Sequence, residues 1–307
     1  MKFNFTAIRF WVKSTMIGVI CLIFLLPTGC GFGKAETVIE QPVPILRVGA
    51  VPSEKKAKTQ DELAKFMDYL GRKTGRTVEL YVADDYNGII DKMAKNQLDI
   101  AWFGPFSYVI AAEAAGAKAF ATDDNIRGGT VYHSVFIVHP DSEIDSLEKV
   151  KGHTFAFTDE TSTSGYLIPK AILRKKGIDA DKDFPEVLFE GSHDASVLAV
   201  KKRQVDVAAV SDTILHSLRE KGIIGDRDIR LIYTSDDIPT SVWAYRQGID
   251  AELLVRIQQA FFDVAQEDKA ALGIYGKDLV KGFVPTDDAK YNIIRETARE
   301  LGIKRPQ

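Results

Sequence analysis

The chain has 307 residues, of which 45% are hydrophobic, and a formal net charge of −3. This length is ample for two domains. The first 30 residues hold three basic side chains and no acids, so the remainder carries −6. A mildly acidic body argues against nucleic acid as a partner, and any capture of an anion would depend on local geometry rather than on long-range attraction.

The chain begins like a secreted protein. Lys2, Arg9 and Lys13 form a basic start, and the apolar run that follows, Met16 to Leu26, is eleven residues long. A helix needs ~20 apolar residues to span a bilayer. The pattern therefore predicts a secretory signal peptide over residues 1–29.

Cys30 follows Thr28 and Gly29, an order that resembles the bacterial lipoprotein cleavage motif. We therefore expect lipidation at Cys30 and a tether over residues 30–44. Ordinary cleavage nearby, which would release a free protein, is the alternative. The other cysteine, Cys21, lies inside the signal, so the mature body is expected to have no disulfide and no cysteine nucleophile.

No cofactor or metal is predicted. The five histidines do not have metal-ligand spacing, and neither a Walker A loop nor a dinucleotide glycine fingerprint occurs.

From Ile45 onward, strand patterns alternate with helix patterns, and Ala251 to Leu301 is predicted to be mainly helical. Such alternation predicts parallel sheets covered by helices. The expected strands are Leu46–Ala50, Val78–Val82, Leu98–Trp102, Val131–Val138, Thr154–Phe157, Val205–Val210 and Thr240–Tyr245. The expected helices before residue 251 include Asp61–Lys73, Tyr86–Lys95, Pro105–Ala115, Leu167–Lys176 and Thr213–Lys221.

Three consecutive hydroxyl residues, Ser162, Thr163 and Ser164, come where a strand pattern gives way to a helix pattern. A helix N-terminus carries unpaired N–H groups and a partial positive charge, which together favour a small oxyanion. One hydroxyl would suffice for an N-cap, which is the alternative role. Gly165 would let the backbone approach closely.

Two segments of the chain resemble each other at a constant offset of 107 residues. Residues 85–101 and residues 192–208 share Lys, Gln, Asp and Ala, with aliphatic residues at matching places. The echo predicts two similar α/β lobes, with Tyr86 and His193 at equivalent helix starts. Because ligands of open α/β sheets bind at the carboxyl ends of strands, these residues would face one cleft.

Tyr132 is a further candidate donor, although a lone tyrosine is often only partly buried with its hydroxyl at the surface. Asp212 follows a predicted strand and would accept from a ligand, or else cap the next helix. By residue type alone, a hydrolase triad could be composed of Ser164, His193 and Asp212. Because no G-x-S-x-G elbow is present, we predict a binding protein rather than an enzyme.

Four motifs together resemble those of the phosphate, phosphite and phosphonate solute receptors of ABC transporters. They are AWFGPFSY at 101–108, STSGY at 162–166, GSHD at 191–194 and QVDVA at 204–208. The resemblance implies a two-lobed α/β periplasmic-binding-protein fold of type II, with crossover hinge strands. We expect one lobe over 45–133 plus 240–307 and the other over 134–239, closing on the ligand.

The same resemblance implies an anion pocket at Ser162, Thr163 and Ser164, with Tyr86, Tyr132 and His193 as further donors. Relatives that hold aminoalkylphosphonates place two carboxylates near the amine; one maps onto Asp212, whereas the other position falls in Ile238-Pro239-Thr240-Ser241, which has no acid. Phosphite or methylphosphonate is therefore expected to fit better than 2-aminoethylphosphonate.

The resulting expectation is a monomeric receptor in the periplasm, lipid-anchored, that passes a small phosphorus oxyanion to a membrane permease. A receptor that reports its ligand to a membrane histidine kinase is the main alternative, and a phosphonate-ester hydrolase is a weaker one.

Overall fold

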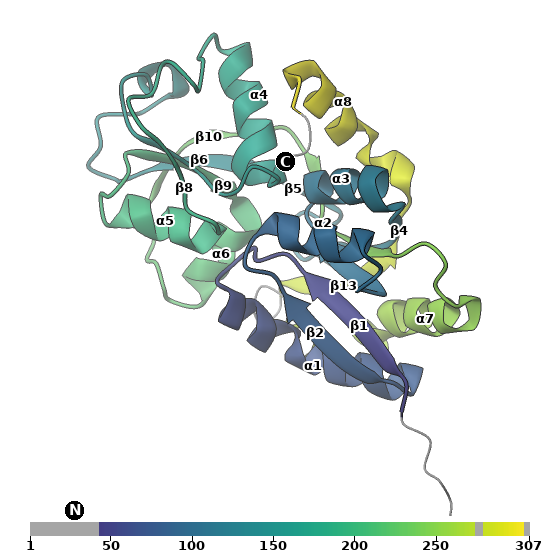
Figure 1. Ribbon diagram of the computed structural model, residues 1–307. Helices are drawn as coiled ribbons and strands as arrows, with labels where there is room; N and C mark the ends of the chain where they lie inside the picture. The colour runs from purple at the N-terminus through teal and green to yellow at the C-terminus, as the bar shows by residue number, and fades with distance from the viewer. Residues whose placement is uncertain (1–42, 274–278, 304–307) are drawn as a thin grey trace, which may run out of the picture. The chain divides into compact units, whose positions relative to one another are not determined.

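The computed structural model describes residues 43–273 and 279–303. The predicted signal peptide, Cys30 and all but the last two residues of the predicted tether lie outside the described residues. Within them the strands form three sheets (Figure 1).

The first sheet has six strands, drawn from residues 45–125 and 242–285. Its order is β13 (Val280–Pro285), β4 (Lys118–Asn125), β12 (Val242–Tyr245), β3 (Ile100–Phe103), β1 (Ile45–Ala50) and β2 (Thr77–Val82). Side chains alternate across it: Trp102 packs in the cluster with α1 (Lys56–Thr74) and α7 (Ala251–Glu267), whereas Ala101 and Phe103 pack in the one with α2 (Tyr86–Ala94) and α3 (Pro105–Ala115). We call this sheet and its helices the first lobe.

The second sheet has five strands, all from residues 134–234. Its order is β10 (Arg230–Thr234), β6 (Ser134–Val138), β9 (Val207–Ser211), β7 (Phe155–Phe157) and β8 (Val187–Phe189). Helices α5 (His193–Lys201) and α6 (Asp212–Glu220) share one hydrophobic cluster with it, and α4 (Ile168–Lys175) shares another. We call this unit the second lobe.

The two sheets have matching strand orders. The order β2-β1-β3-β12-β4 in the first corresponds to β8-β7-β9-β6-β10 in the second, and β12 and β6 each run antiparallel to both neighbours. Helix α2 lies between β2 and β3 in sequence, as α5 lies between β8 and β9. The echo at an offset of 107 therefore marks equivalent elements, as predicted. Both sheets are mixed rather than purely parallel.

The chain crosses between the lobes twice, through β5 (Val131–Tyr132) and β11 (Ile238–Pro239), which pair antiparallel. The prediction of one strand over Val131–Val138 was wrong, because it is divided at His133. There the Asp212 carboxylate accepts the His133 N–H at 3.0 Å, and the Asp212 N–H donates to the His133 carbonyl. The chain changes sheets at this residue.

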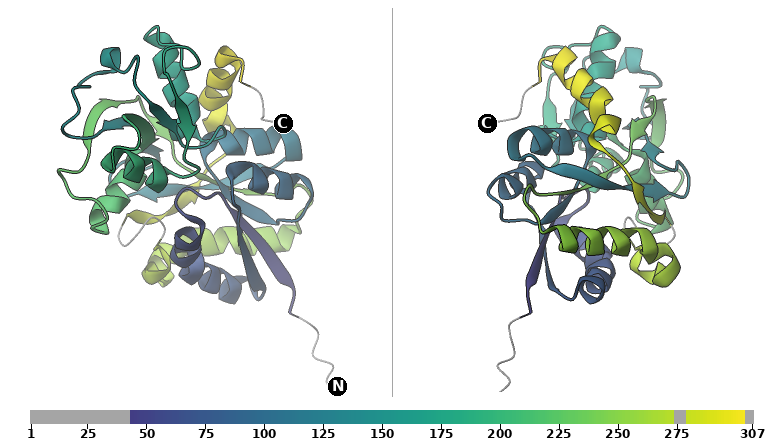
Figure 2. Two further views of the ribbon diagram at one scale, coloured as in Figure 1. Left: turned by 60° about the vertical axis from the view of Figure 1, so that its left-hand side comes forward. Right: turned by 90° about the vertical axis from the view of Figure 1, so that its right-hand side faces the viewer.

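The C-terminal part was also only partly predicted. Its helices are α7 and α8 (Asn292–Leu301), and strand β13 lies between these two helices in the sequence. Short 3-10 turns occur at Lys269–Ala271 and Asp288–Tyr291. β13 pairs antiparallel with β4 at the sheet edge, where Val280 and Phe283 are buried. Helix α8 contacts both α3 and α4 (Figure 2), and the Arg174 guanidinium donates to the Glu300 carbonyl at 2.9 Å.

Candidate ligand-binding site

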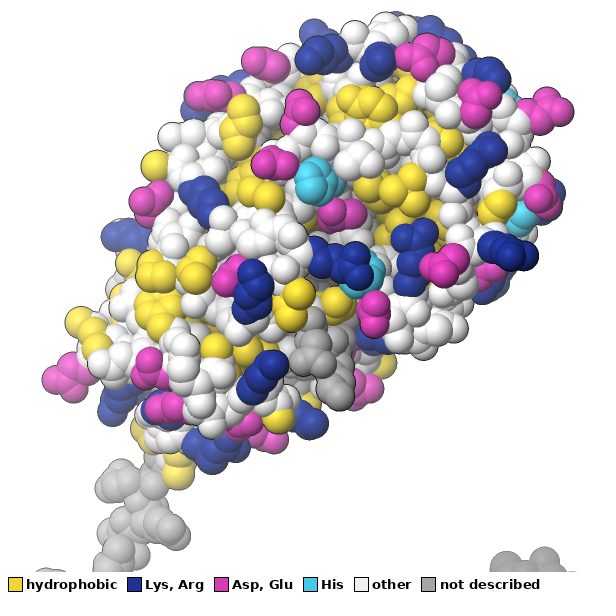
Figure 3. Space-filling model, turned by 180° about the vertical axis from the view of Figure 1, so that it is seen from behind, with side chains coloured by type: hydrophobic (Ala, Val, Ile, Leu, Met, Phe, Trp, Pro, Cys, Tyr) yellow, Lys and Arg dark blue, Asp and Glu magenta, His cyan; other side chains and the backbone are white. Residues whose placement is uncertain are grey.

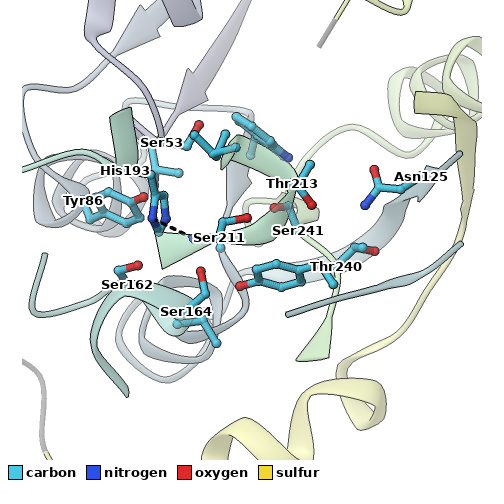
Figure 4. Close-up of a pocket in the computed structure, with 16 residues that line it drawn as sticks. Ser53, Tyr86, Asn125, Ser162, Ser164, His193, Ser211, Thr213, Thr240 and Ser241 are labelled. Carbon is cyan, nitrogen blue, oxygen red and sulfur yellow. Dashed lines mark hydrogen bonds between the residues drawn. The ribbon is translucent and has the colours of Figure 1, made fainter. Parts of the chain in front are cut away.

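A cavity lies between the two lobes, at the carboxyl ends of their strands (Figure 4). It leaves about 30 Å³ for the centres of water-sized molecules, which is room for about two or three waters. Its lining is Val51, Ser53, Tyr86, Trp102, Gly104, Asn125, Tyr132, Ser162, Thr163, Ser164, His193, Ser211, Thr213, Ile214, Thr240 and Ser241. The cavity is therefore small and lined mostly by hydroxyl groups.

The hydroxyl triplet forms one wall of the cavity and is fully buried. Ser162 is the N-cap of a short π-helix, Thr163–Leu167, and its Oγ accepts the N–H of Gly165 at 3.1 Å. The N–H groups of Thr163 and Ser164 belong to the first turn, where no carbonyl one turn back can accept them. The sequence prediction of a helix start at this triplet is confirmed, although the first turn is π-helical.

The three hydroxyls of the triplet differ in their hydrogen bonding. Thr163 Oγ1 accepts the backbone N–H of Phe106 in the first lobe at 2.8 Å, so it also joins the lobes. Ser164 Oγ is buried without a hydrogen bond of regular geometry among the described residues. A buried hydroxyl that lacks a partner costs free energy unless a ligand or water supplies one. Ser164 therefore offers the triplet's clearest open position for a ligand oxygen.

The turn that carries the triplet requires glycine at position 165. A Cβ at this position would lie 2.2 Å from Thr158 Oγ1 and 2.9 Å from Ser162 Oγ, well inside contact distance. Its carbonyl accepts the Thr158 N–H at 3.0 Å, since Pro169, four residues on, has no N–H to offer. The turn is thus held against β7 by a backbone approach that only glycine permits.

Two buried tyrosines complete the polar wall. Tyr86 is the first residue of α2, after its N-cap Asp85, and burial raises its pKa well above the ordinary value, with Asp159 adding to the effect. Tyr132 lies in the crossover strand β5, and burial raises its pKa to about 12, although the neighbouring Ser164 and Thr163 lower it. Both phenols therefore stay protonated and are donors at neutral pH.

His193 is the first residue of α5 and is 4% exposed. The Ser211 N–H donates to its Nδ1 at 3.2 Å, so Nδ1 carries no proton and Nε2 must carry it. Burial lowers the pKa of His193 to about 4, although Asp194 opposes this. The ring is therefore neutral at pH 7, and its Nε2–H is the donor it can offer.

The cavity lining contains no Asp, Glu, Lys or Arg among the described residues. A charged ligand there would be held by oriented neutral dipoles, without a counter-charge that must itself be desolvated. On the face of the molecule shown in Figure 3, acidic and basic side chains are intermixed.

Asp212 is the predicted site residue that the structure does not bring into this cavity. Its Oδ2 lies 2.8 Å from Nδ1 of His133 in the crossover, and Nε2 of that ring lies 3.1 Å from Asp237 Oδ1. It begins α6, but the N-cap is Ser211. Asp212 lines a second hollow instead, beside the first, which shares Asn125 and Thr213 with it.

The other six predicted site residues, Ser162, Thr163, Ser164, Tyr86, Tyr132 and His193, all line the cavity. Sequence reasoning missed several of their neighbours, namely Ser53, Trp102, Asn125, Ser211, Thr213 and Ser241. Ser211 and Thr213 flank Asp212 at a predicted strand end, which was a usable signal. Asn125 gave none, because no motif surrounds it at the end of strand β4.

None of the helices in the described residues is both long and apolar enough to cross a membrane. No cluster of three or more potential metal ligands occurs in that part of the chain.

The matched sheets, the double crossover and the cavity between them define a type II periplasmic-binding-protein fold. The model of the family described as ABC transporter, phosphonate, periplasmic substrate-binding protein matches residues 48–291. The chain belongs to this family. Proteins of this family are periplasmic solute receptors rather than enzymes, and they serve an ABC permease in the membrane.

Three relatives support the assignment. The phosphonates-binding periplasmic protein of Escherichia coli is 31% identical over 76% of this chain and 70% of its own. The phosphate-import protein PhnD of Mycolicibacterium smegmatis is 26% identical over 92% and 94%. The crystal structure of a binding protein component of an ABC phosphonate transporter from Pseudomonas aeruginosa is 30% identical, with a TM-score of 0.77 over 83% of this chain and 85% of that one.

Proposed function

We propose that this protein captures a small phosphorus oxyanion, phosphite or methylphosphonate, between its lobes and delivers it to an ABC permease. The observation that carries the proposal is the cavity lined from both lobes by neutral donors. Ser162, Thr163, Ser164, Tyr86, Tyr132 and His193 are the proposed ligand-binding residues. The names of the relatives, which include phosphate and phosphonate binders, support the ligand class.

The small cavity and the absence of acids from its lining favour ligands without an amine. The segment in which a second acid would be expected for an aminoalkylphosphonate ends in Thr240 and Ser241 and has no acid. Thr240 Oγ1 donates to the Asp123 carbonyl at 2.8 Å. A ligand ammonium would lose its hydration without gaining a carboxylate, which is a large cost in a buried site. Asp212, bonded to His133, would not be available to it without rearrangement.

Binding is proposed to proceed by closure of the lobes, one over 45–133 plus 240–307 and the other over 134–239, about the crossovers β5 and β11. Three contacts support this by joining the lobes around the cavity. Thr163 accepts from Phe106, the His193 N–H donates to the Ser53 carbonyl at 3.1 Å, and the Tyr86 N–H donates to Asp159 at 3.5 Å.

Fluorescence titration of the mature protein tests this function. The mature chain has two tryptophans, Trp102 and Trp243, and Trp102 lines the cavity. We expect a saturable change in emission with phosphite or methylphosphonate, and none with sodium chloride at equal ionic strength. Equal responses to all three would contradict the proposal.

We also propose that the mature protein is a monomer anchored through an acylated Cys30. The support is the sequence motif at Thr28-Gly29-Cys30. Mass spectrometry of the membrane-associated protein should show a lipid-modified N-terminal cysteine, and Cys30→Ala should release the protein from membranes. An unmodified N-terminus at another residue would refute the anchor.

A further inference from the structure

A cross-lobe ion cluster lies outside the ligand cavity. Lys221, the C-cap of α6 in the second lobe, pairs with two carboxylates of the first lobe, Glu54 and Glu62. Its Nζ lies 3.4 Å from Glu54 Oε2 and also hydrogen-bonds Glu62 Oε1. The Glu54 side chain is only 1% exposed and also pairs with Lys58 of its own lobe. One cation from the second lobe thus meets two carboxylates of the first.

The cluster is connected directly to elements that line the cavity. Glu54 follows Ser53, which lines the cavity and accepts the His193 N–H. Lys221 ends the helix whose first residues, Thr213 and Ile214, also line it. At 1.5 Å per residue, the helix places Lys221 about 12 Å from Thr213. Movement of either lobe must therefore move the cavity wall and the ion cluster together.

These contacts differ from the other ion pairs of residues 43–273 and 279–303. The others join residues of the same lobe, apart from those of His133 in the crossover itself. Burial and the neighbouring Glu54 raise the pKa of Glu62 to about 7, although Lys221 lowers it, so the two carboxylates of the first lobe repel each other. Lys58 of the same lobe pairs with Glu54, whereas Lys221 brings a cation from the second lobe that pairs with both Glu54 and Glu62.

We propose that Lys221 is a positioning residue that latches the lobes in the closed state by neutralising Glu54 and Glu62, and so slows release of the ligand. The proposal rests on the proposed function only in that the ligand is held by lobe closure. Lys221 touches no ligand, so its effect should appear in the closing equilibrium and in the dissociation rate.

Lys221→Met tests the latch, with Lys176→Met as the matched control. Lys176 is also a helix C-cap lysine and pairs with a glutamate, Glu148, at 3.1 Å, but within the second lobe. With phosphite and methylphosphonate as probes, Lys221→Met should weaken affinity roughly tenfold, mostly through a faster dissociation rate. Lys221→Arg should recover most of the affinity, and Lys176→Met should behave as the wild type.

A distance measurement keeps the test independent of ligand identity. The mature body has no cysteine, so labels placed at Lys95→Cys and Lys202→Cys, on the exposed ends of α2 and α5, would report the lobe separation. Without ligand, Lys221→Met should shift the population toward longer distances, with the melting temperature unchanged relative to Lys176→Met. An unchanged distance distribution would overturn the latch, as would unchanged dissociation of a bound probe.

Failure of the proposed function would look different. In that case no oxyanion would alter the label distance in the wild type, whereas the ligand-free effect of Lys221→Met would remain.

Discussion

The hydroxyls of the triplet are chemically alike but differ in what they already bond. Ser162 Oγ caps the π-helix, Thr163 Oγ1 joins the lobes, and Ser164 Oγ has no regular partner. The sequence predicted all three as oxyanion donors, and their roles in binding stay a prediction. The sequence could not predict which hydroxyl makes which hydrogen bond, because this depends on Phe106 and on the close packing at Gly165.

Ser164→Ala should weaken ligand affinity by ~1–3 kcal/mol, the cost of losing a hydrogen bond to a charged group. It should leave the melting temperature unchanged, because Ser164 Oγ has no regular protein partner to lose. Ser162→Ala is the comparison: it should weaken binding and also cost ~0.5–2 kcal/mol of stability through the lost N-cap. Calorimetry and thermal unfolding measure both. Unchanged affinity in Ser164→Ala would indicate that the triplet has a structural role and does not bind the ligand.

His193 should be neutral in the folded protein throughout the physiological range, with its proton on Nε2. Its pKa is lowered by burial to about 4, below the ordinary value of about 6.5. The stability from burying the neutral ring is therefore present above pH 6.5 and is lost as pH falls toward 4. NMR of the imidazole nitrogens at about pH 6 should show the neutral Nε2–H form. A titration midpoint at or above 6.5 would contradict this donor assignment.

At the scale of elements, the π-helical turn that carries the triplet depends on Gly165. Gly165→Ala would force a Cβ to within 2.4 Å of Thr158 Cβ, so we expect a loss of ~1–3 kcal/mol of stability and weaker binding as the turn shifts. Gly225→Ala is the control, because the nearest atom to a Cβ there is 3.7 Å away. Chemical denaturation measures both variants. Equal stability of the two would show that the turn tolerates the change.

The crossover at His133 should respond to pH. Burial lowers the pKa of His133, but hydrogen bonds and charges of Asp212 and Asp237 outweigh it, and the net shift is upward. The stability from this contact is therefore fully present below about pH 6.5 and is lost as pH rises through the raised pKa. Relative to His133→Gln, the wild type should lose stability as pH rises above about 6.5 in denaturation experiments. Parallel pH profiles of the two proteins would contradict this.

Elements with a clear local pattern were predicted well, and those set by distant pairing were not. Pro105–Ala115 is helical over its predicted range, because Pro105 starts it and Gly116 ends it with a φ of +64°. Strand β13 was missed because its partner β4 lies more than a hundred residues earlier. The break at His133 was missed for a similar reason, since its hydrogen-bond partner is Asp212.

At the scale of the whole molecule, the internal echo predicted the paired lobes, because each lobe repeats one strand order. The echo placed Tyr86 and His193 at equivalent helix starts, and both line the cavity. Sequence alone could not show that the lining of this cavity has no charged side chain, because Ser53, Asn125 and Ser241 reach it from separate elements. That neutrality is what gives the proposed preference for small oxyanions without an amine.

Calorimetry on the mature protein with phosphite, methylphosphonate, phosphate and 2-aminoethylphosphonate tests the central claim most directly. We predict that phosphite or methylphosphonate binds at least about tenfold more tightly than 2-aminoethylphosphonate, a difference of ~1.4 kcal/mol. Tightest binding of 2-aminoethylphosphonate, or binding of none of the four, would contradict the account.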